Sequence, residues 1–435
     1  MKFTFSFTMS VATDGDMPAQ PMSADGFQYP DIATNISEAS RELIEFPARN
    51  GQDGYGPSGT TRVSFPLAPG QNYWDPINSH IMFDVLQTGG TNTKLGFIGL
   101  ASVVRTFIFK QQGGQPIIRL DSYHLILSVL AQFYSAEWIY GAGRRYGYGS
   151  DMQREADGAV ATPGKQIELD CAAMGPFRAR RYFPNFAAGL EFVLELEQPV
   201  LAQVASAGSP TYSLSNAKML VELVTGTAFL DEAVLSGMSA GIPLQIPVDS
   251  YRYVPQAVLA NETVTQKNFS VQQDQVVTYF NRFILQSSLS TQTIDAFELN
   301  VNPGIVSQQL QLGGQLIPPQ PLGFTNGAAE AIAEIHNAMF RHESPVSALM
   351  DGDAFSSNPP VGAVPSQTSR MMTAIAIGSA RDAHVNAGLD LNTPPGQSTL
   401  RLNLAAPLSS VLQIIQVVNF VLHIRILPNQ IESVG

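Results

Sequence analysis

The sequence predicts an all-β protein built from two similar modules, and three observations support this prediction. Short runs rich in Val, Ile, Phe, Tyr and Thr are separated by turn residues, with 36 glycines and 29 prolines in 435 residues, which is typical of β-sandwiches and barrels. A motif occurs twice, with its Gly-Gly pair at Gly113-Gly114 and, 200 residues later, at Gly313-Gly314. The length also allows two cores, because a single core stops growing at about 250–300 residues.

The first copy of the motif spans residues 99–133. A β-rich run at 106–110 leads into the pair Gly113-Gly114, which supplies the positive φ values of a tight hairpin turn. Asp121 is the expected N-cap of a following helix. One face of that helix should pack against the sheet, because its apolar residues recur at three- and four-residue spacing. These residues are Tyr123, Ile126, Leu127, Leu130 and Phe133.

The second copy repeats this order of features. A run at 306–312 meets Gly313-Gly314, and a segment at 328–340 again has helical spacing. Asn326 is the candidate cap of this helix, and several alanines raise its helix propensity. The expected buried stripe consists of Ile332, Ile335 and Met339.

Each half also ends alike, in two predicted strands. At 190–196, apolar residues alternate with glutamates, interrupted by Val193, and this period of two predicts one buried and one solvated face. The run at 400–404 alternates in the same way. The final strands are expected at 219–224 and 412–427, and the similar order of elements suggests a duplication.

Turn residues and weak periodicity divide the chain. We expect an N-terminal arm at 1–40, a first module at 41–235, a connector at 236–262 that carries three prolines, and a second module at 263–435. Loops are expected to extend from the modules where turn residues cluster and no period persists. These loops are 51–59, 141–164 and 351–369.

Charge and composition restrict the function. A net charge of −12 argues against direct wrapping of nucleic acid, which requires clustered Lys and Arg. Two basic clusters are expected to pair internally or across a subunit boundary. They are Arg144 with Arg145, and Arg178 with Arg180 and Arg181. Only 14% of residues are charged, which predicts an obligate oligomer with large covered surfaces.

Two further observations concern location. The single Cys171 excludes an intrachain disulfide framework and leaves the redox compartment open. No run reaches the roughly 18–20 apolar residues of a membrane span. The N-terminus lacks the sustained apolar region of a signal peptide and is expected to be an extended arm.

The segment GLASVVRTFIFKQQGGQPIIRLDSYHLILSVL resembles the first-module signature of double jelly-roll major capsid proteins, the lineage of tectiviruses, adenoviruses, virophages and polinton-like viruses. The match is carried by Gly99, Ser102, Arg105, Gly113, Gly114, Asp121 and Tyr123. The second copy resembles the equivalent place in the second jelly roll, but without the basic residue or the Asp-Tyr pair.

This resemblance implies two consecutive eight-stranded jelly rolls with short helices in the loops. It further implies a structural protein whose homotrimer, with a pseudo-hexagonal outline, tiles an icosahedral virion shell assembled inside the host cell. The implied partners are other copies of the chain, with penton and minor capsid proteins, and contact with an inner membrane is left open. Sequence-specific nucleic-acid binding is not implied, and neither is a cofactor.

Two pairs of residues have spacings known from enzymes. Ser215 and Lys218 match a serine-lysine pair, but they lie where a loop enters a predicted strand, and residues three apart on a strand face opposite sides. Glu195 and Glu197 share a strand face about 7 Å apart by the strand rise, a separation that suits the paired carboxylates of glycosidases, and they are interpreted as a solvated face. We therefore predict no catalytic residues.

Metal and modification motifs are similarly weak. The histidines at 80, 124, 336, 342, 384 and 423 include no His-x-His pair, so the metal cluster of a cupin-type jelly roll is missing. Asp14, Asp16, Asp351 and Asp353 are interpreted as polar turns. The glycosylation patterns at Asn35, Asn261 and Asn268 occur often by chance. We predict no metal and no cofactor site.

The leading hypothesis is therefore a viral major capsid protein that works by burial and geometry. The alternative from another class is a two-domain β-sandwich glycan-binding protein or glycanase, and a third is a vertex or spike protein. Virus, host, triangulation number, genome type, internal membrane, receptor and the outward-facing loops are left open.

Overall fold

The structure is a computed structural model. It describes residues 40–51, 53–70, 72–161, 164–179, 182–184, 189–225, 236, 244–271, 273, 275–312, 314–324, 329–339, 369–377, 391, 397–427 and 430–434.

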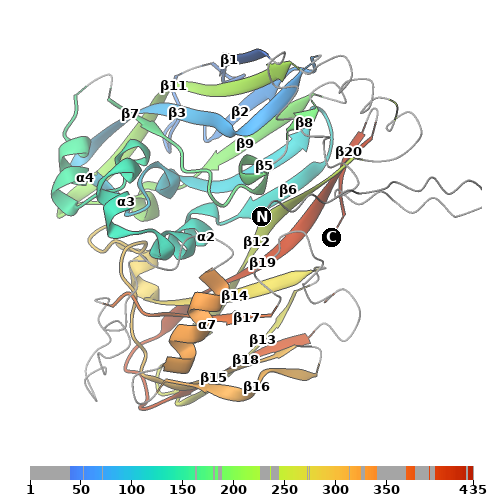
Figure 1. The fold of residues 1–435 in the computed structure, drawn as a ribbon. Helices are drawn as coiled ribbons and strands as arrows, with labels where there is room; N and C mark the ends of the chain where they lie inside the picture. The colour runs from blue at the N-terminus through green and yellow to red at the C-terminus, as the bar shows by residue number, and fades with distance from the viewer. Residues whose placement is uncertain are drawn as a thin grey trace, which may run out of the picture.

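The first module consists of two antiparallel four-stranded sheets (Figure 1). One sheet has the order β1 (Ser40–Pro47), β11 (Ala207–Thr225), β3 (Tyr73–Thr91) and β7 (Lys165–Glu168). The other has the order β2 (Arg62–Leu67), β9 (Leu190–Leu196), β5 (Val104–Gln111) and β6 (Pro116–Asp121). Three short strands, β4, β8 and β10, are accessory to these sheets. β4 (Lys94–Leu95) pairs with β10 (Gln203–Val204), and β8 (Phe183–Pro184) pairs with β3.

The second module has the same construction. One sheet has the order β12 (Leu244–Val258), β19 (Leu412–Leu427), β14 (Val276–Leu285) and β17 (Met372–Ala376). The other has the order β13 (Val264–Ser270), β18 (Gln397–Leu404), β15 (Ile305–Leu312) and β16 (Gln315–Gly323). Strand β20 (Gln430–Val434) pairs with the end of β19.

The two modules share one topology. Without the accessory strands, each has eight strands, whose order along the chain is 1-8-3-6 in one sheet and 2-7-4-5 in the other. This arrangement is that of a jelly roll, in which two Greek keys close two packed sheets. The prediction of an all-β chain with two consecutive eight-stranded jelly rolls is confirmed.

Short helices lie between the fifth and sixth strands of each module. The first module has α2 (Tyr123–Leu130), α3 (Ala136–Tyr140) and α4 (Asp151–Gly158), with short 3-10 turns between them, and the second has α7 (Ala329–Met339). A further short helix, α5 (Pro199–Ala202), precedes β10. No helix in the described ranges is long and apolar enough to cross a membrane.

Helix α4 corrects the expected loop at 141–164. The hydroxyl of Ser150 accepts a hydrogen bond from the backbone N–H of Gln153, and the Gln153 side chain accepts one from the backbone N–H of Ser150. This capping box satisfies backbone donors at the start of the helix. The signal was present in the sequence as Ser-x-x-Gln.

Both glycine hairpins are confirmed, as β5–β6 and β15–β16. Gly113 has a φ of +73° and Gly314 a φ of +89°. Gly313 and the candidate cap Asn326 lie outside the described residues. Among the described side chains of α7, Ala331, Ile335 and Ala338 are buried and Ile332 is only half-buried, while the side chain of Met339 lies outside the described residues.

Asp121 does not cap α2, contrary to expectation. It ends β6, and its carboxylate accepts a hydrogen bond from Arg119 Nε at 2.9 Å. Ser122, with a φ of +57°, stands at the N-cap without a side-chain cap. All eight residues of α2 are buried, not one face only, because the helix packs against strands of both modules.

The solvated face expected for residues 190–196 is also corrected. Glu191 on β9 is only 6% exposed. Its carboxylate accepts a hydrogen bond from Ser64 Oγ at 2.5 Å and pairs with Lys110 Nζ at 2.9 Å. Because Lys110 and Ser64 on the neighbouring strands compensate its negative charge, Glu191 can be buried.

Part of the expected connector at 236–262 is a strand. Residues 244–258 form β12 and pair with β19 along their whole length. The prolines at 247 and 255 fit because β12 is the edge strand of its sheet, where one side of the backbone needs no ladder donor. The expected arm at 1–40 lies outside the described residues except Ser40, and so does the loop at 351–369 except Ser369.

Candidate functional site

The two jelly rolls meet along a seam formed by α2, β6 and the turn at 175–178 of the first module and by β12, β14 and β19 of the second. Helix α2 packs on β5 of its own module and on β12, β14 and β19 of the other, and β6 packs against β12 (Figure 1). The rings of Phe133 and Phe280 meet across the seam with centroids 5.3 Å apart. Near the C-terminus, the backbone N–H of Ile431 donates to Gln111 Oε1 at 3.4 Å.

Arg154 of α4 carries the charged part of the seam. Its side chain is 1% exposed, and its guanidinium contacts Asp295 at 2.6 Å, Glu298 at 2.8 Å and Asp151 at 2.7 Å. Asp295 and Glu298 belong to the second module. Burial raises the pKa of Glu298, and the Arg154 charge opposes that rise. Arg370 also lies 3.7 Å from Glu298.

Arg282 of β14 and Gln132 bridge the seam with hydrogen bonds. Arg282 Nη1 donates to Ser128 Oγ of α2 at 2.8 Å, Nη2 donates to the Leu299 carbonyl at 3.1 Å, and Nε donates to Asn300 Oδ1. Gln132 Nε2 approaches the carbonyls of Phe297 and Glu298 at 3.4 Å each. The segment at 295–300 is therefore held by Arg154 of α4 and by Gln132, which directly follows α2.

Glycine allows the closest backbone approach. A Cβ at Gly175 would lie 2.1 Å from the carbonyl oxygen of Asp249 in β12. Such a separation is far below van der Waals contact, and the blocking atom is backbone. The turn at 175–178 can therefore pack this closely on β12 only with glycine at this position.

Replacing Gly175 with alanine is expected to lower the free energy of unfolding by about 1–3 kcal/mol, because overpacking forces the two modules apart. Urea unfolding measures the loss. Gly323→Ala is the matched control, since its Cβ would meet only Glu330 Oε2 at 3.5 Å, an ordinary contact. Equal losses in the two variants would contradict the role given to Gly175.

His124 is a buried titratable group on α2. Its Nδ1 lies 3.1 Å from the Val104 carbonyl and its Nε2 lies 3.7 Å from Glu197. Burial lowers the pKa of His124 from 6.5 to about 4, although the Val104 carbonyl favours the charged form. The imidazole is therefore neutral at pH 7.

The pKa of His124 predicts acid sensitivity. Its contribution to stability is complete above about pH 6.5 and is lost as the pH falls towards about 4, because the unfolded chain binds the proton more tightly. We expect a loss of about 3 kcal/mol over this range, from about 1.4 kcal/mol per pKa unit. His124→Gln should remove this component from urea unfolding curves measured between pH 7 and 4. Parallel curves for the two proteins would contradict it.

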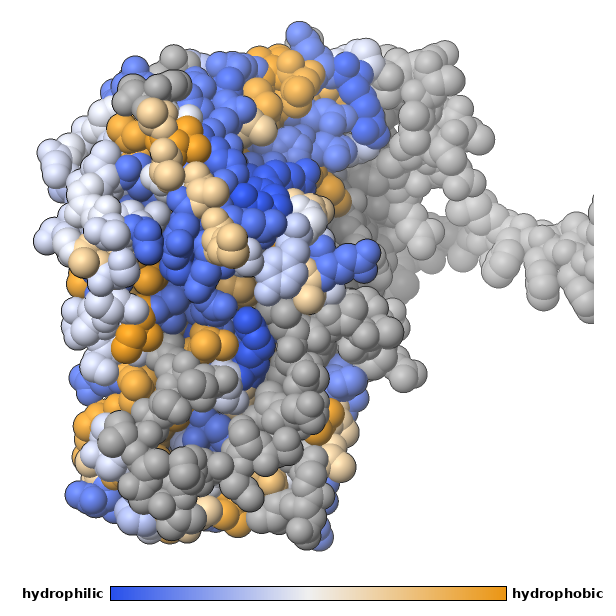
Figure 2. All heavy atoms as spheres, turned by 90° about the vertical axis from the view of Figure 1, so that its left-hand side faces the viewer, coloured by the Kyte–Doolittle hydropathy of each residue, from blue (hydrophilic) through white to orange (hydrophobic). Residues whose placement is uncertain are grey.

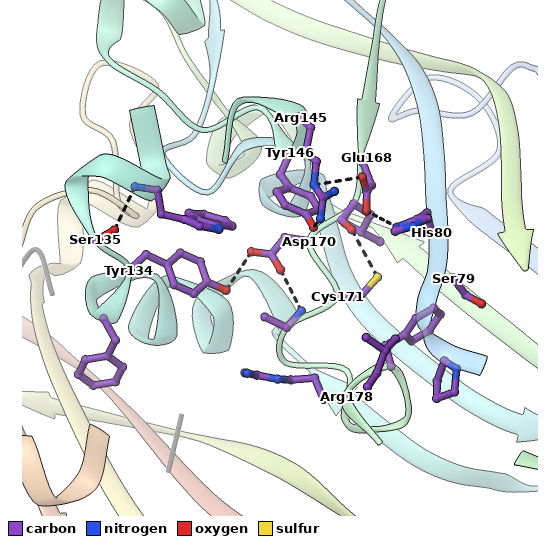
Figure 3. A pocket seen from close by; sticks show the side chains of 17 residues that line it. Ser79, His80, Tyr134, Ser135, Arg145, Tyr146, Glu168, Asp170, Cys171 and Arg178 are labelled. Carbon is purple, nitrogen blue, oxygen red and sulfur yellow. Dashed lines mark hydrogen bonds and ion pairs between the residues drawn. The ribbon is translucent and has the colours of Figure 1, made fainter. Parts of the chain in front are cut away.

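A pocket of about 290 Å³ opens beside α3 in the first module (Figure 3). Trp138 and Tyr146 stack at 5.7 Å with an angle of 20° between their rings, and the Arg145 guanidinium lies 4.5 Å from the Tyr146 ring. Glu168 binds His80 Nδ1 at 2.7 Å and lies 3.5 Å from Arg145 Nε. Aromatic rings and ion-paired side chains therefore line this side of the pocket.

Asp170 lies at the centre of the pocket wall (Figure 3). Its carboxylate accepts hydrogen bonds from Tyr148 at 2.8 Å, Tyr134 at 3.1 Å and the Ala172 N–H at 2.9 Å. Burial raises the pKa of Asp170, and burial also raises the pKa of the neighbouring Cys171 thiol. A protonated thiol is a poor nucleophile, and both carboxylates already accept hydrogen bonds, so the arrangement serves packing or binding better than catalysis.

Members of the two enzyme-like pairs have other ionic partners. Lys218 lies 3.3 Å from Glu45, and Glu195 lies 3.6 Å from Arg105. Glu197, in contrast, faces His124. No group of three metal-binding side chains occurs among the described residues. The candidate turns at Asp14, Asp16, Asp351 and Asp353, the glycosylation pattern at Asn35, and two histidines, 342 and 384, lie outside those residues.

The basic clusters pair internally where they are described. Arg144 contacts Asp157 at 2.9 Å and Arg145 contacts Glu168. Arg180 and Arg181 lie outside the described residues. Sequence reasoning missed Arg154, Arg282 and Gln132, because their partners lie far away along the chain and no local pattern marks them.

The outer surface beside α3 and α4 carries both hydrophobic and hydrophilic side chains. Figure 2 shows hydrophobic groups scattered among hydrophilic ones on the face turned to the left in Figure 1. Among the described residues, Met152 of α4 is 81% exposed and Tyr140 of α3 is 47% exposed. Apolar side chains exposed singly are ordinary on protein surfaces, so these two residues do not by themselves mark a contact patch.

No family model matches the sequence, and no curated protein matches it significantly. Solved structures do match. The PBCV-1 virus capsid model aligns with a TM-score of 0.52 at 12% identity, over 91% of this chain and 97% of that chain. The Sputnik virophage structure aligns at 0.55 and 11%, over 91% and 88%. The Faustovirus major capsid protein aligns at 0.53 and 8%, over 88% and 90%. Together with the duplicated eight-stranded topology, these matches show that the chain has the double jelly-roll fold of viral major capsid proteins.

Proposed function

We propose that this chain is a structural major capsid protein that forms a homotrimer and tiles an icosahedral virion shell. The observation that carries the proposal is the repetition of one jelly-roll topology within a single chain. Three such chains around a threefold axis present six similar modules, so one contact geometry can serve a hexagonal lattice. The fold shared with the PBCV-1, Sputnik and Faustovirus proteins supports this role.

The seam supports the same proposal, because a building block of a lattice needs a fixed angle between its modules. We propose residues 41–225 and 244–434 as the two modules and residues 1–40 as an arm. The proposed partners are sister copies, penton and minor capsid proteins, and an inner membrane, all within the virion. The chain has no enzymatic role in this proposal.

The alternative of a glycan-binding protein or glycanase gains no support from its candidate carboxylates. Glu195 is paired with Arg105, and Glu197 lies beside buried His124. The two side chains therefore do not form a free acid and base pair of the kind that glycoside hydrolysis uses.

Light scattering on the purified protein at neutral pH tests the proposed oligomer. We expect a mass three times that of the 46.9 kDa chain, unchanged on dilution into the micromolar range. A stable monomer would contradict the proposal, and a monomer that binds oligosaccharides would favour the alternative.

A further inference from the structure

We propose that Arg282 is a positioning residue that sets the orientation of the second jelly roll against the first. The inference rests on the proposed function, because the angle between modules decides whether three chains close into a ring. The double jelly-roll fold does not by itself require an arginine at this position.

The side chain of Arg282 is placed at the seam by β14. The residue is 0% exposed, and its neighbour two positions earlier, Phe280, meets Phe133 of the first module on the same strand face. Its three donors reach three separate acceptors: Ser128 on α2, and Leu299 and Asn300 in the seam segment. One planar group therefore connects both modules.

The hydrogen bonds of Arg282 all go to neutral acceptors; burial lowers its pKa to about 9, and the more distant charges of Asp295 and Glu298 oppose that fall. No carboxylate of the described residues lies within ion-pair distance of it, whereas Arg154 has three. A buried cation whose hydrogen-bond partners are all neutral is costly to desolvate. Stability alone therefore does not account for arginine at this position.

Removal of the guanidinium would leave Asn300 Oδ1 and the Leu299 carbonyl without the donor that each receives from Arg282, whereas Ser128 and the Asn300 amide nitrogen keep other bonds. Ser128 Oγ also donates to the Leu125 carbonyl at 2.7 Å, and Asn300 Nδ2 donates to the Met371 carbonyl at 2.9 Å. The variant also loses a directional contact between the modules. A guanidinium forms hydrogen bonds only at fixed angles in its plane, whereas a methionine side chain adapts to many packings.

The experiment compares Arg282→Met with the matched control Arg401→Met. Arg401 of β18 bonds Gln311 of the same module at 2.9 Å and does not reach the seam. Spin labels at exposed positions 166 and 266, one in each module, report the distance between modules in a Cys171→Ala background, with labelled chains diluted by unlabelled ones. Thermal unfolding and trimer fraction are measured on the same proteins.

We expect Arg282→Met to unfold within a few degrees of the parent protein, to broaden the distance distribution about twofold, and to weaken trimer association roughly tenfold. Arg401→Met should change none of these. Ser128→Ala, which removes the acceptor on the other module, should broaden the distribution by itself and add little to Arg282→Met.

A narrow, unchanged distribution in Arg282→Met would overturn the inference. If that variant fails to fold, Ser128→Ala decides: a broad distribution supports the role of Arg282 and a narrow one overturns it. A parent protein that is monomeric would refute the proposed trimer, while the distance measurement would still test Arg282 separately.

Discussion

Replacing Arg154 with methionine is expected to lower the free energy of unfolding by about 3–5 kcal/mol, because removing one member of a buried ionic cluster leaves the others uncompensated. Asp295 and Glu298 of the second module would lose their shared counter-ion, and Asp151 would lose one of its two cationic partners. The loss should appear in urea unfolding followed by circular dichroism. Because these contacts join the modules, we also expect the unfolding transition to broaden or divide.

The matched control is Arg41→Met. Arg41 pairs with Glu222 at 2.9 Å, but its side chain is 49% exposed, so the loss should stay below about 1 kcal/mol. If Arg154→Met cost no more than Arg41→Met, the cluster would not hold the modules together.

Replacing Trp74 with alanine is the second large change, with an expected loss of about 3–5 kcal/mol from the transfer and cavity terms. The indole is fully buried in the first jelly roll. It meets Phe183 and Phe192 with centroids at 5.1 Å and Phe177 at 5.4 Å, and its Nε1 donates to Ser79 Oγ at 2.9 Å. Calorimetry measures the loss, and the heat of unfolding should decrease in the transition of the first module.

Trp138→Ala provides the comparison. This other tryptophan lines the open pocket and is only partly buried, so its removal should cost clearly less. A loss at Trp138 equal to that at Trp74 would contradict the view that the aromatic cluster around Trp74 forms the centre of the first module.

Much of the fold could be predicted because its signals are local. The glycine pairs fix hairpins through their own φ values, and the alternation of residues 412–427 reproduces β19 to its ends. Local signals misled where distant groups act. Glu191 reads as solvated until Lys110 and Ser64 are brought beside it, and the prolines of β12 read as a connector until the strand is known to lie at an edge.

The seam could not be predicted from sequence by the same reasoning. Arg154 and Asp295, or Ser128 and Arg282, are separated by more than a hundred residues, and each residue type is ordinary in its own segment. Only the stacking of one jelly roll on the other brings them together. The pocket, likewise, draws its walls from β3, α3 and the end of β7.

Electron microscopy of the purified oligomer tests the central claim most directly, since it shows the number and arrangement of the modules in one particle. We predict a threefold block with six similar lobes and a hexagonal outline. Particles with two lobes, or oligomers in which the modules do not close into a ring, would contradict the account.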